Sequence, residues 1–420
     1  MRSSQPQARL GPPTIRSGNR AGVLEVIRRN QGISRAELSR HTGLTHAAIS
    51  NIVGELLEQG LIIEDGQSSA ELGRPRIRLT INATRYAVIG VDLARSQIRA
   101  IVSDLQGNIL RSISAASTYD HPVEITLSTL TELLEQLLAD CGELCGRIVG
   151  IGVGAPGPLS AAEGTILSPP NFGSWRNVPI KQILEERFGL PVFIDNDANG
   201  CALAEGWFGA GRTFEDFIYL AIGTGVGAGI MTGGVIQRGV HGIAGEVGHT
   251  TIEVAGPHCT CGNYGCLELY TSATALVQAA QQAMMCGEDT MLTDICAGQP
   301  QSMSVEAIAI AARRGDLLSL RLIDQEIQYL GAAIVSLINL LDPQAVFLGR
   351  EVAQAAGDLL LEPLRALVAK RAFSVAAEQV QILCATLGND APVIGAACLV
   401  IQELFRSPER VLHAERMPSR

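Results

Sequence analysis

The sequence predicts a small winged helix-turn-helix over residues 19–82, followed by a larger α/β fold over residues 86–420. Three observations lead to this prediction. At 420 residues, the chain is too long for one small hydrophobic core. Near Tyr86 the pattern changes from closely spaced helix signals to repeated strand and helix signals. The charge changes there as well: residues 1–86 hold 12 Arg and 7 acidic residues, a net charge of +5, whereas the rest has a net charge of −15.

The first part of the chain has the signals of three helices and two strands. Residues 1–18 are rich in Pro, Arg, Gln and Ser without apolar periodicity, which predicts a flexible arm. Helical periodicity begins at Asn19, and Ser34 with Glu37 forms the capping box of a second helix. A glycine-containing turn ends that helix, and Thr45 caps the third. The apolar stripe of the third helix is Ile49, Ile52, Val53, Leu56 and Leu57.

The residue types at the start of the third helix indicate DNA binding. They are small or hydrogen-bonding, at the place where a recognition helix meets the edges of bases, and an exposed structural helix normally carries Lys and Glu there. The alternative is a three-helix module that binds another protein. The predicted base contacts are Thr45, His46, Ala47, Ser50 and Asn51. The predicted wing contacts to phosphate or the minor groove are Arg74 and Arg76.

From Tyr86 onward, buried-type strands alternate with amphipathic helices, which predicts a mostly parallel sheet repeated in two halves. The apolar stretch Ile218–Ile236 contains six glycines, so it predicts strands and turns rather than a membrane helix, and we expect no stable membrane insertion. The predicted strands are Ala87–Asp92, Ile98–Asp104, Ile109–Ser112, Ile148–Gly154, Val192–Asp195 and Phe217–Ile222, with helices at Leu127–Leu138 and between Ser304 and Asp342.

The ten cysteines are spread through the chain, and its first residues lack the apolar segment of a signal peptide, so we expect a reduced, cytoplasmic protein. Three of these cysteines stand close together in the segment CTCGNYGC. The pattern His249-x9-Cys259-x-Cys261-x4-Cys266 offers one imidazole and three thiolates, the ligands of a closed, structural Zn²⁺ site. His258 is the alternative imidazole, but its position next to Cys259 would require a strained chelate.

Several polar residues stand where a ligand could be held. Glu246 and Glu268 flank the zinc loop 249–266, and two carboxylates on one rigid loop can accept hydrogen bonds from neighbouring sugar hydroxyls. Asn196 and Asp197 follow the strand Val192–Asp195, at the carboxyl edge where α/β sheets bind ligands. A glycine-rich turn over residues 223–229 could expose amides to a phosphate, although it is not a Walker loop.

These motifs resemble the ROK family (repressors, open reading frames and sugar kinases) from about residue 19 to the end. The resemblance implies the actin-like ATPase fold of sugar kinases, two lobes around a cleft. The N-terminal winged domain is typical of the repressor branch, which includes xylose and N-acetylglucosamine repressors. The motifs that carry the resemblance are Ala155-Pro156-Gly157, Asn196-Asp197-Ala198-Asn199, the turn 223–229, Gly245–His249 and CTCGNYGC.

The resemblance also implies roles for individual residues. Asp197 takes the place of the kinase base, so we interpret it as vestigial in a chain with no catalytic residue. His249 doubles as a zinc ligand and a sugar contact. The implied sugar contacts are Asn171, Asn196, Asp197, Glu246, His249 and Glu268.

Two nucleotide loops depart from the kinase pattern. Kinases of the family carry Asp-Ile-Gly-Gly-Thr-Lys after the first strand, whereas this chain has Asp92-Leu93-Ala94-Arg95-Ser96-Gln97. The second glycine pair is replaced by Gly349-Arg350-Glu351. Because phosphoryl transfer depends on positioning and charge stabilisation, these changes argue against kinase activity.

We therefore expect a repressor of carbohydrate metabolism that is not an enzyme. Its expected partners are operator DNA, a sugar or sugar-phosphate effector, and further copies of the chain in a homodimer or homotetramer. Two alternatives are an ATP-dependent sugar kinase with an appended DNA-binding domain, and a scaffold that binds a protein partner.

Overall fold

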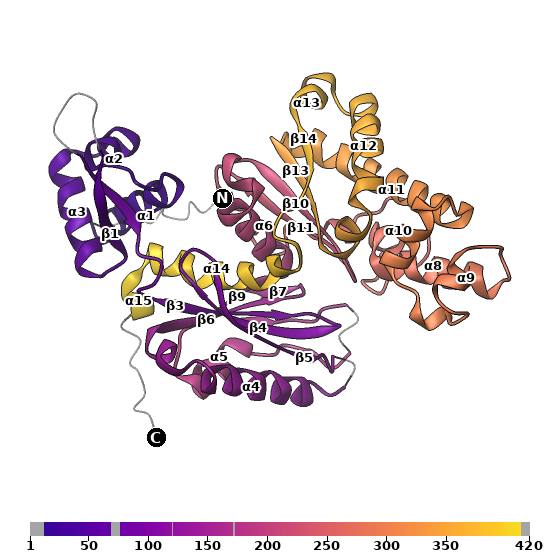
Figure 1. The fold of residues 1–420 in the computed structure, drawn as a ribbon, viewed down its shortest axis with the longest axis horizontal. Coiled ribbons are helices and arrows are strands. Elements are labelled where there is room, and N and C mark those ends of the chain that lie inside the picture. The colour runs from indigo at the N-terminus through magenta and orange to yellow at the C-terminus, as the bar shows by residue number, and fades with distance from the viewer. Residues whose placement is uncertain (1–11, 69–75, 120, 171–172, 413–420) are drawn as a thin grey trace, which may run out of the picture.

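A computed structural model describes residues 12–68, 76–119, 121–170 and 173–412, and it shows a small N-terminal domain beside a two-lobed body (Figure 1). The N-terminal elements are α1 (Pro12–Arg29), α2 (Arg35–Thr42), α3 (His46–Glu58), β1 (Ile62–Ser68) and β2 (Arg76–Ile81). The two strands pair antiparallel and form the wing. This is the predicted winged helix-turn-helix.

Local sequence signals set the ends of these helices. The side chain of Ser34 accepts from the Glu37 amide and the Glu37 carboxylate accepts from the Ser34 amide, which confirms the capping box. Gly43 ends α2 in the left-handed region with a φ of 69°, and Thr45 caps α3. The first helix differs from expectation, because it begins at Pro12 rather than near Asn19. Proline suits the first turn of a helix, where its missing N–H costs nothing. The rest of the predicted arm, residues 1–11, lies outside the described residues.

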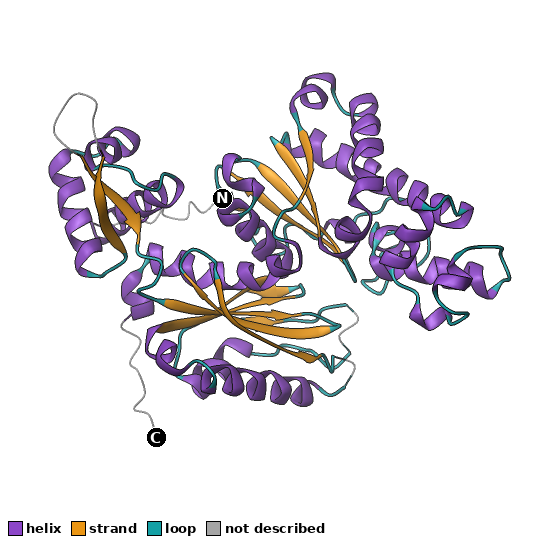
Figure 2. Cartoon of the chain, viewed as in Figure 1, coloured by secondary structure: helices purple, strands orange, loops and turns teal. Residues whose placement is uncertain are grey.

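Each lobe of the body is built on a five-stranded sheet (Figure 2). The first sheet has the order β5-β4-β3-β6-β9, with two antiparallel pairings followed by two parallel ones. The second has the order β12-β11-β10-β13-β14 and repeats this arrangement. The first sheet comprises β3 (Ala87–Leu93), β4 (Gln97–Asp104), β5 (Ile109–Ala116), β6 (Ile148–Ala155) and β9 (Val192–Asn196). The second comprises β10 (Phe217–Ile222), β11 (Val226–Thr232), β12 (Val235–Ile236), β13 (Ala345–Gly349) and β14 (Gln381–Cys384).

The expected repeat in two halves is confirmed, but the expectation of mostly parallel sheets is wrong. Strands joined by short turns have to run antiparallel, and only the strands separated by long crossovers run parallel. The apolar stretch 218–236 is accordingly the meander β10-β11-β12. Within the described part of the chain, no helix is both long and apolar enough to cross a membrane. All ten cysteines are described, and none is in a disulfide.

Helices cover both faces of each sheet. In the first lobe, α4 (Val123–Ala139) and α5 (Ile180–Phe188) lie on the face opposite α14 (Ala391–Arg406) (Figure 1). The remaining short strands are β7 (Leu159–Ser160) and β8 (Thr165–Ile166). The remaining helices are α6 (Asp197–Phe208), α7 (Glu268–Thr271), α8 (Ala273–Met285), α9 (Leu292–Ile295), α10 (Val305–Arg313), α11 (Leu317–Leu341), α12 (Arg350–Arg371), α13 (Ser374–Gln379) and α15 (Pro408–Leu412).

Two helices join the lobes at the centre of the body. Helix α6 follows the last strand of the first sheet and packs on β10 and β11 of the second, while α14 follows the second sheet and packs on β3 and β6 of the first. Their contact needs small residues, since a Cβ on Gly395 would lie 2.2 Å from the carbonyl carbon of Gly200. The first residue of α6 therefore lies at the junction of the two lobes.

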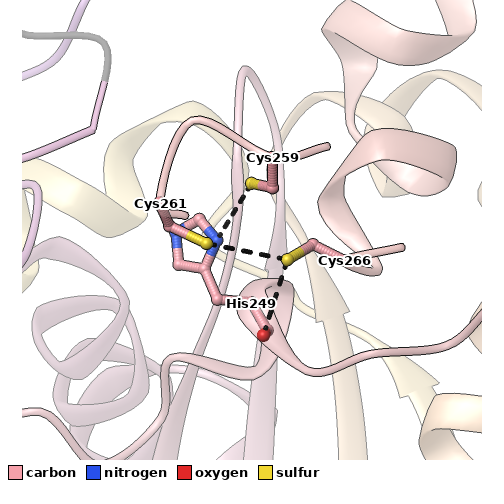
Figure 3. Close-up of side chains that lie close together, drawn as sticks. All are labelled: His249, Cys259, Cys261 and Cys266. Carbon is pink, nitrogen blue, oxygen red and sulfur yellow. Dashed lines mark hydrogen bonds between the residues drawn. The ribbon is translucent and has the colours of Figure 1, made fainter. Parts of the chain in front are cut away.

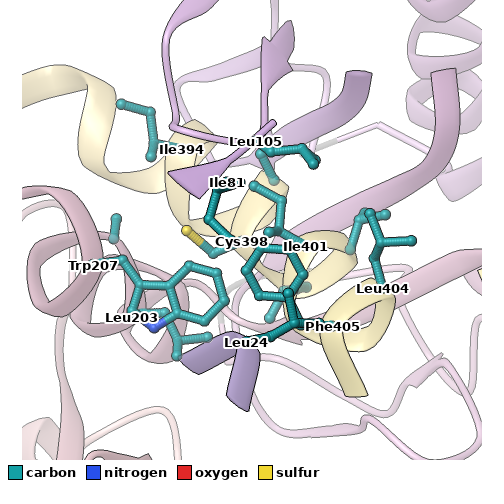
Figure 4. Packing of buried hydrophobic residues seen from close by; sticks show 14 of the residues in the cluster. Leu24, Ile81, Leu105, Leu203, Trp207, Ile394, Cys398, Ile401, Leu404 and Phe405 are labelled. Atoms are coloured by element: carbon teal, nitrogen blue, oxygen red, sulfur yellow. The ribbon is translucent and has the colours of Figure 1, made fainter. Parts of the chain in front are cut away.

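The winged domain is docked on the same central helices. Figure 4 shows Leu24 of α1 beside Trp207 of α6 and Phe405 of α14, and all three are at least nine-tenths buried. The guanidinium of Arg28 lies 4.6 Å from the centre of the Trp207 ring, and that ring stacks on Phe405 at 6.2 Å. We call Leu24, Arg28, Trp207 and Phe405 the docking cluster. Two exposed ion pairs border it, Arg29 to Glu215 at 2.6 Å and Arg20 to Glu409 at 2.8 Å.

Candidate functional site

The four predicted metal ligands converge in one place, with their ligand atoms all within 4.8 Å of one another (Figure 3). Cys259 Sγ lies 3.7 Å from His249 Nδ1, and Cys261 Sγ lies 3.7 Å from Cys266 Sγ. A tetrahedral Zn²⁺ with bonds of about 2.3 Å to sulfur and 2.0–2.1 Å to nitrogen requires separations of about 3.6–3.8 Å. The donor set and these two separations therefore fit a four-coordinate Zn²⁺, and a site with four protein ligands is a closed one.

The loop around this cluster is held by an asparagine side chain and by a close backbone approach at one glycine. Asn263 donates to the His249 carbonyl at 3.1 Å and to Cys266 Sγ at 3.5 Å, which ties the two ends of the loop together. Gly265 has a φ of 59°, and a Cβ there would lie 1.7 Å from the Glu253 carbonyl oxygen. Because His258 packs edge-on against Tyr264 instead, it is not part of the cluster.

Five of the six predicted sugar contacts line one pocket between the lobes. Asn196 and Asp197 come from the junction of β9 and α6 in the first lobe. The other three, Glu246, His249 and Glu268, come from the segment around the zinc loop. The sixth, Asn171, lies outside the described residues, although its neighbour Pro170 lines the pocket.

Backbone contacts hold these side chains in place. The Asn196 side chain accepts from the Ala198 amide at 2.9 Å and so caps α6 from within the pocket. Glu268 accepts from the Val226 amide at 3.0 Å, which fixes its carboxylate against the glycine-rich turn. Glu246 approaches the first lobe so closely that a Cβ on Gly157 would lie 2.3 Å from its Oε1. A side chain at position 157 would therefore displace the Glu246 carboxylate from its present position.

The pocket is acidic and partly shielded from water. Burial raises the pKa of Glu246 to about 7, and the negative charges of Asp197 and Glu268 act in the same direction. Near neutral pH this carboxyl group therefore exists in both forms, able either to accept from a ligand hydroxyl or to donate to a ligand oxygen. Such a group suits a neutral, hydroxyl-rich ligand.

Two neighbours of the predicted contacts have structural roles instead. Asp195 is buried and accepts from Asn199 Nδ2 at 3.0 Å and from Arg238 Nε at 2.7 Å. This network connects the end of β9 to the segment that leads to Glu246. The ion pair with Arg238 is not visible in the sequence, because 43 residues separate the two partners.

The glycine-rich turn between β10 and β11 also lines the pocket, but two arginines occupy the space in front of it. Arg95 Nη2 donates to the Thr224 carbonyl at 2.9 Å, and Arg350 reaches in from the start of α12. The side chains of Leu93 and Ala94 line the pocket beside them. From the sequence we treated positions 94, 95 and 350 only as departures from glycine, and we missed that two arginines lie against the glycine-rich turn.

The predicted base-reading residues form one exposed surface on the winged domain. Thr45, His46, Ala47, Ser50 and Asn51 are all exposed, whereas Ile49, Ile52, Val53 and Leu56 of the same helix are buried. The predicted stripe residue Leu57 is only partly buried. Arg74 lies outside the described residues, and Arg76 is the first residue of β2.

Comparisons with known proteins agree with this architecture. A model of the ROK family matches residues 88–403, and a model of the MarR family matches residues 16–70. The xylose repressor of Caldicellulosiruptor bescii is 34% identical over 391 residues, which cover 93% of this chain and 97% of that protein.

Two solved structures show the same architecture. A ROK family transcriptional regulator, described as a homolog of the E. coli MLC protein, superimposes with a TM-score of 0.81 at 29% identity, covering 96% of this chain and 99% of the other. A ROK family glucokinase from Streptomyces griseus, solved with glucose and AMPPNP, superimposes with a TM-score of 0.64 at 34% identity, covering 74% of this chain and 98% of the other. The chain therefore belongs to the ROK family, with a MarR-like winged helix-turn-helix in front of a two-lobed sugar-kinase fold.

Proposed function

We propose that this protein is a cytoplasmic transcriptional repressor that binds operator DNA through its winged domain. Its affinity for the operator decreases or increases when a sugar binds in the cleft. The observation that carries the proposal is the presence, in one chain, of an exposed recognition helix and an interlobe pocket lined by carboxylates. The 34% identity to a xylose repressor over nearly the whole length supports it, because both parts are shared.

Sugar recognition falls to the residues that line the pocket. Asp197, Glu246 and Glu268 accept hydrogen bonds from hydroxyls, and Asn196 and Asn171 add amide contacts. Zn²⁺ held by His249 and the three cysteines has a structural role: it fixes the loop between Glu246 and Glu268, so loss of the metal removes the pocket. The effector is a sugar or a sugar phosphate.

The same pocket is poorly suited to phosphoryl transfer. The segment Asp92–Gln97 lacks the glycines that let phosphates approach, and Arg350 stands where the second glycine pair of a kinase would lie. Asp197, the position of the kinase base, is still present, and it keeps a sugar kinase with an appended DNA-binding domain as the second candidate. An ATP-consumption assay over a panel of sugars separates the two functions.

Helix α6 supplies a physical connection between the two sites. It begins at Asp197 in the pocket and extends to Phe208. Near its end, the ring of Trp207 contacts the guanidinium of Arg28 in the winged domain. Twelve residues of α-helix span about 18 Å. A tilt of α6 as the lobes close on a sugar would move the surface on which the winged domain is docked. In a homodimer or homotetramer, that motion changes the spacing of two recognition helices.

A reciprocal titration tests this function. A thermal-shift screen of free and phosphorylated sugars first identifies the effector, because a ligand of the native state raises its melting temperature. Operator affinity is then measured with and without this sugar, and sugar affinity with and without operator. We expect the sugar to change operator affinity, and operator DNA to change sugar affinity, by the same factor of roughly 5- to 150-fold.

Variants of the zinc-loop segment provide the controls. Glu246→Ala should abolish the sugar response and keep sugar-free operator binding, since Glu246 lines the pocket and is not part of the winged domain. Glu253→Ala removes an exposed carboxylate that does not line the pocket, and it should respond like the wild type. Identical sugar affinities with and without operator would show that the domains are not coupled.

A further inference from the structure

Arg350 adopts a backbone conformation that an arginine normally avoids. It is the first residue of α12 and has a φ of 70°, in the left-handed region where glycine is the ordinary occupant. The preceding Gly349 has no room for a side chain, because a Cβ there would lie 2.0 Å from Tyr219 Oη. The strained arginine is therefore held by what its side chain contacts, rather than by a favourable backbone.

Those contacts cross the cleft. Arg350 belongs to the second lobe, and its Nη1 lies 3.7 Å from Asp92 Oδ2 while its Nη2 lies 4.0 Å from Asp197 Oδ2. Both carboxylates belong to the first lobe, one on β3 and one at the start of α6. The Arg350 side chain is 16% exposed and the Asp92 side chain 14%, so the pair is largely shielded from solvent.

The charges of the three groups depend on one another. Burial raises the pKa of Asp92 to about 6, although Arg350 lowers it. Burial would lower the pKa of Arg350, but Asp92 and Asp197 outweigh it and raise that pKa. A buried ion pair of this kind fixes geometry more than it adds stability, since desolvation offsets much of the attraction. Asp92 Oδ1 is buried and has no hydrogen-bond partner among the described residues, so the hydrogen-bonding capacity of this carboxylate is not fully used.

A second link crosses the cleft beside the first. Arg95 follows β3 in the first lobe and donates to the carbonyl of Thr224 in the turn between β10 and β11 of the second. The two arginines thus reach across the cleft in opposite directions, and both line the pocket next to the predicted sugar contacts.

We propose that Arg350 is a built-in cation that clasps the two lobes together by bridging Asp92 and Asp197, in the space that a metal–nucleotide would need. In phosphoryl-transfer enzymes, divalent cations neutralise charge between such groups and the phosphates. The residues present do not fit that complex, because Arg350 and Arg95 lie against the glycine-rich turn, 3.4 Å and 3.5 Å from where a Cβ on Gly223 and Gly225 would be. Ala94 and Arg95 also stand where the kinase pattern has two glycines. The clasp lets lobe closure depend on the sugar alone, without a nucleotide. It builds on the proposed sugar sensing, but it is testable in sugar-free protein.

Amide hydrogen exchange of the full-length, zinc-loaded, sugar-free protein tests the clasp. Arg350→Met removes the charge and keeps a long side chain, and Asp92→Asn removes one carboxylate. Each should raise exchange at least ten-fold in the turns 94–97 and 223–227, on opposite sides of the cleft. Because the two residues act through one contact, the double variant should exchange no faster than the faster single variant. Arg350→Gly should behave in the same way even though it relieves the backbone strain.

Arg313→Met is the matched control. It breaks the 2.6 Å ion pair between Arg313 of α10 and Asp358 of α12, which lies wholly within the second lobe. Exchange in the two turns should then stay at the wild-type rate. Unchanged exchange in Arg350→Met, or a double variant whose effect is the product of the single effects, would overturn the clasp. Calorimetric binding of Mg²⁺·AMPPNP to the wild type would overturn it as well. If the exchange results confirm the clasp but the protein binds no sugar in the thermal-shift screen, only the proposed sensing function would be contradicted.

Discussion

Replacing Phe405 with alanine tests whether apolar packing docks the winged domain on the body. Phe405 is the residue that α14 contributes to the docking cluster, and its side chain is 5% exposed. It belongs to the body, so its loss leaves the internal core of the winged domain intact. The expected result is a looser winged domain that still folds and still binds DNA.

The magnitude follows from the contacts. Truncating a buried Phe to Ala costs about 3–5 kcal/mol, of which the aromatic pair with Trp207 supplies about 0.5–1.5 kcal/mol. The flanking ion pair of Arg29 with Glu215 is different, because its side chains are 31% and 60% exposed. Such a pair contributes about 0–1 kcal/mol and is screened by salt.

Urea unfolding and operator binding measure the two consequences. We expect Phe405→Ala to lose about 3–5 kcal/mol of unfolding free energy. In this variant, the sugar should no longer change operator affinity, so the ratio of affinities with and without sugar should be close to one. Its sugar affinity should be retained, because the pocket is untouched. Arg29→Ala should change the unfolding free energy by less than about 1 kcal/mol and keep the sugar response. If Arg29→Ala costs as much as Phe405→Ala, or if Phe405→Ala keeps the full sugar response, the docking argument fails.

Three further outcomes are expected. Metal analysis should find about one Zn²⁺ per chain, and Cys266→Ser should lose metal, sugar binding and stability together; full sugar affinity in metal-free protein would contradict a structural zinc. In fluorescence-anisotropy titrations, Ser50→Ala or Asn51→Ala should weaken operator binding more than binding to random DNA, whereas Arg74→Ala should weaken both and lower the salt slope by about one; equal losses on both DNAs for all three variants would refute this division. Because the pKa of Asp92 is raised from 3.8 to about 6, its native state binds a proton more tightly than its unfolded state. Wild-type stability relative to Asp92→Asn should therefore fall by up to about 3 kcal/mol as pH rises from 4 to 7, and a flat difference in urea unfolding would count against it.

Signals that act over a few residues determined much of this protein. The capping box of Ser34 and Glu37 and the cap at Thr45 depend on side chains and amides only three residues apart, so they are visible in the sequence. The same holds for the predicted strands, whose buried residues follow one another along the chain. The ligand set of the candidate metal site is also local, because all four residues fall between positions 249 and 266.

The direction of the strands and the choice of histidine needed the folded chain. Meanders and crossovers give similar strand patterns, and only the pairing shows that each sheet is mixed. His249 and His258 are both close to the cysteines in sequence, but the bend of the loop sends His258 against Tyr264.

The contacts that we propose connect DNA binding with sugar sensing depend on the tertiary structure alone. Arg28 meets Trp207 across 179 residues of chain, and Arg350 meets Asp92 and Asp197 only because α6 and α14 bring the two lobes together. The sequence could show that the kinase glycines are absent at residues 94, 95 and 350, and this argues against kinase activity. It could not show that an arginine spans the gap, because such a contact depends on distances between lobes that no local pattern encodes.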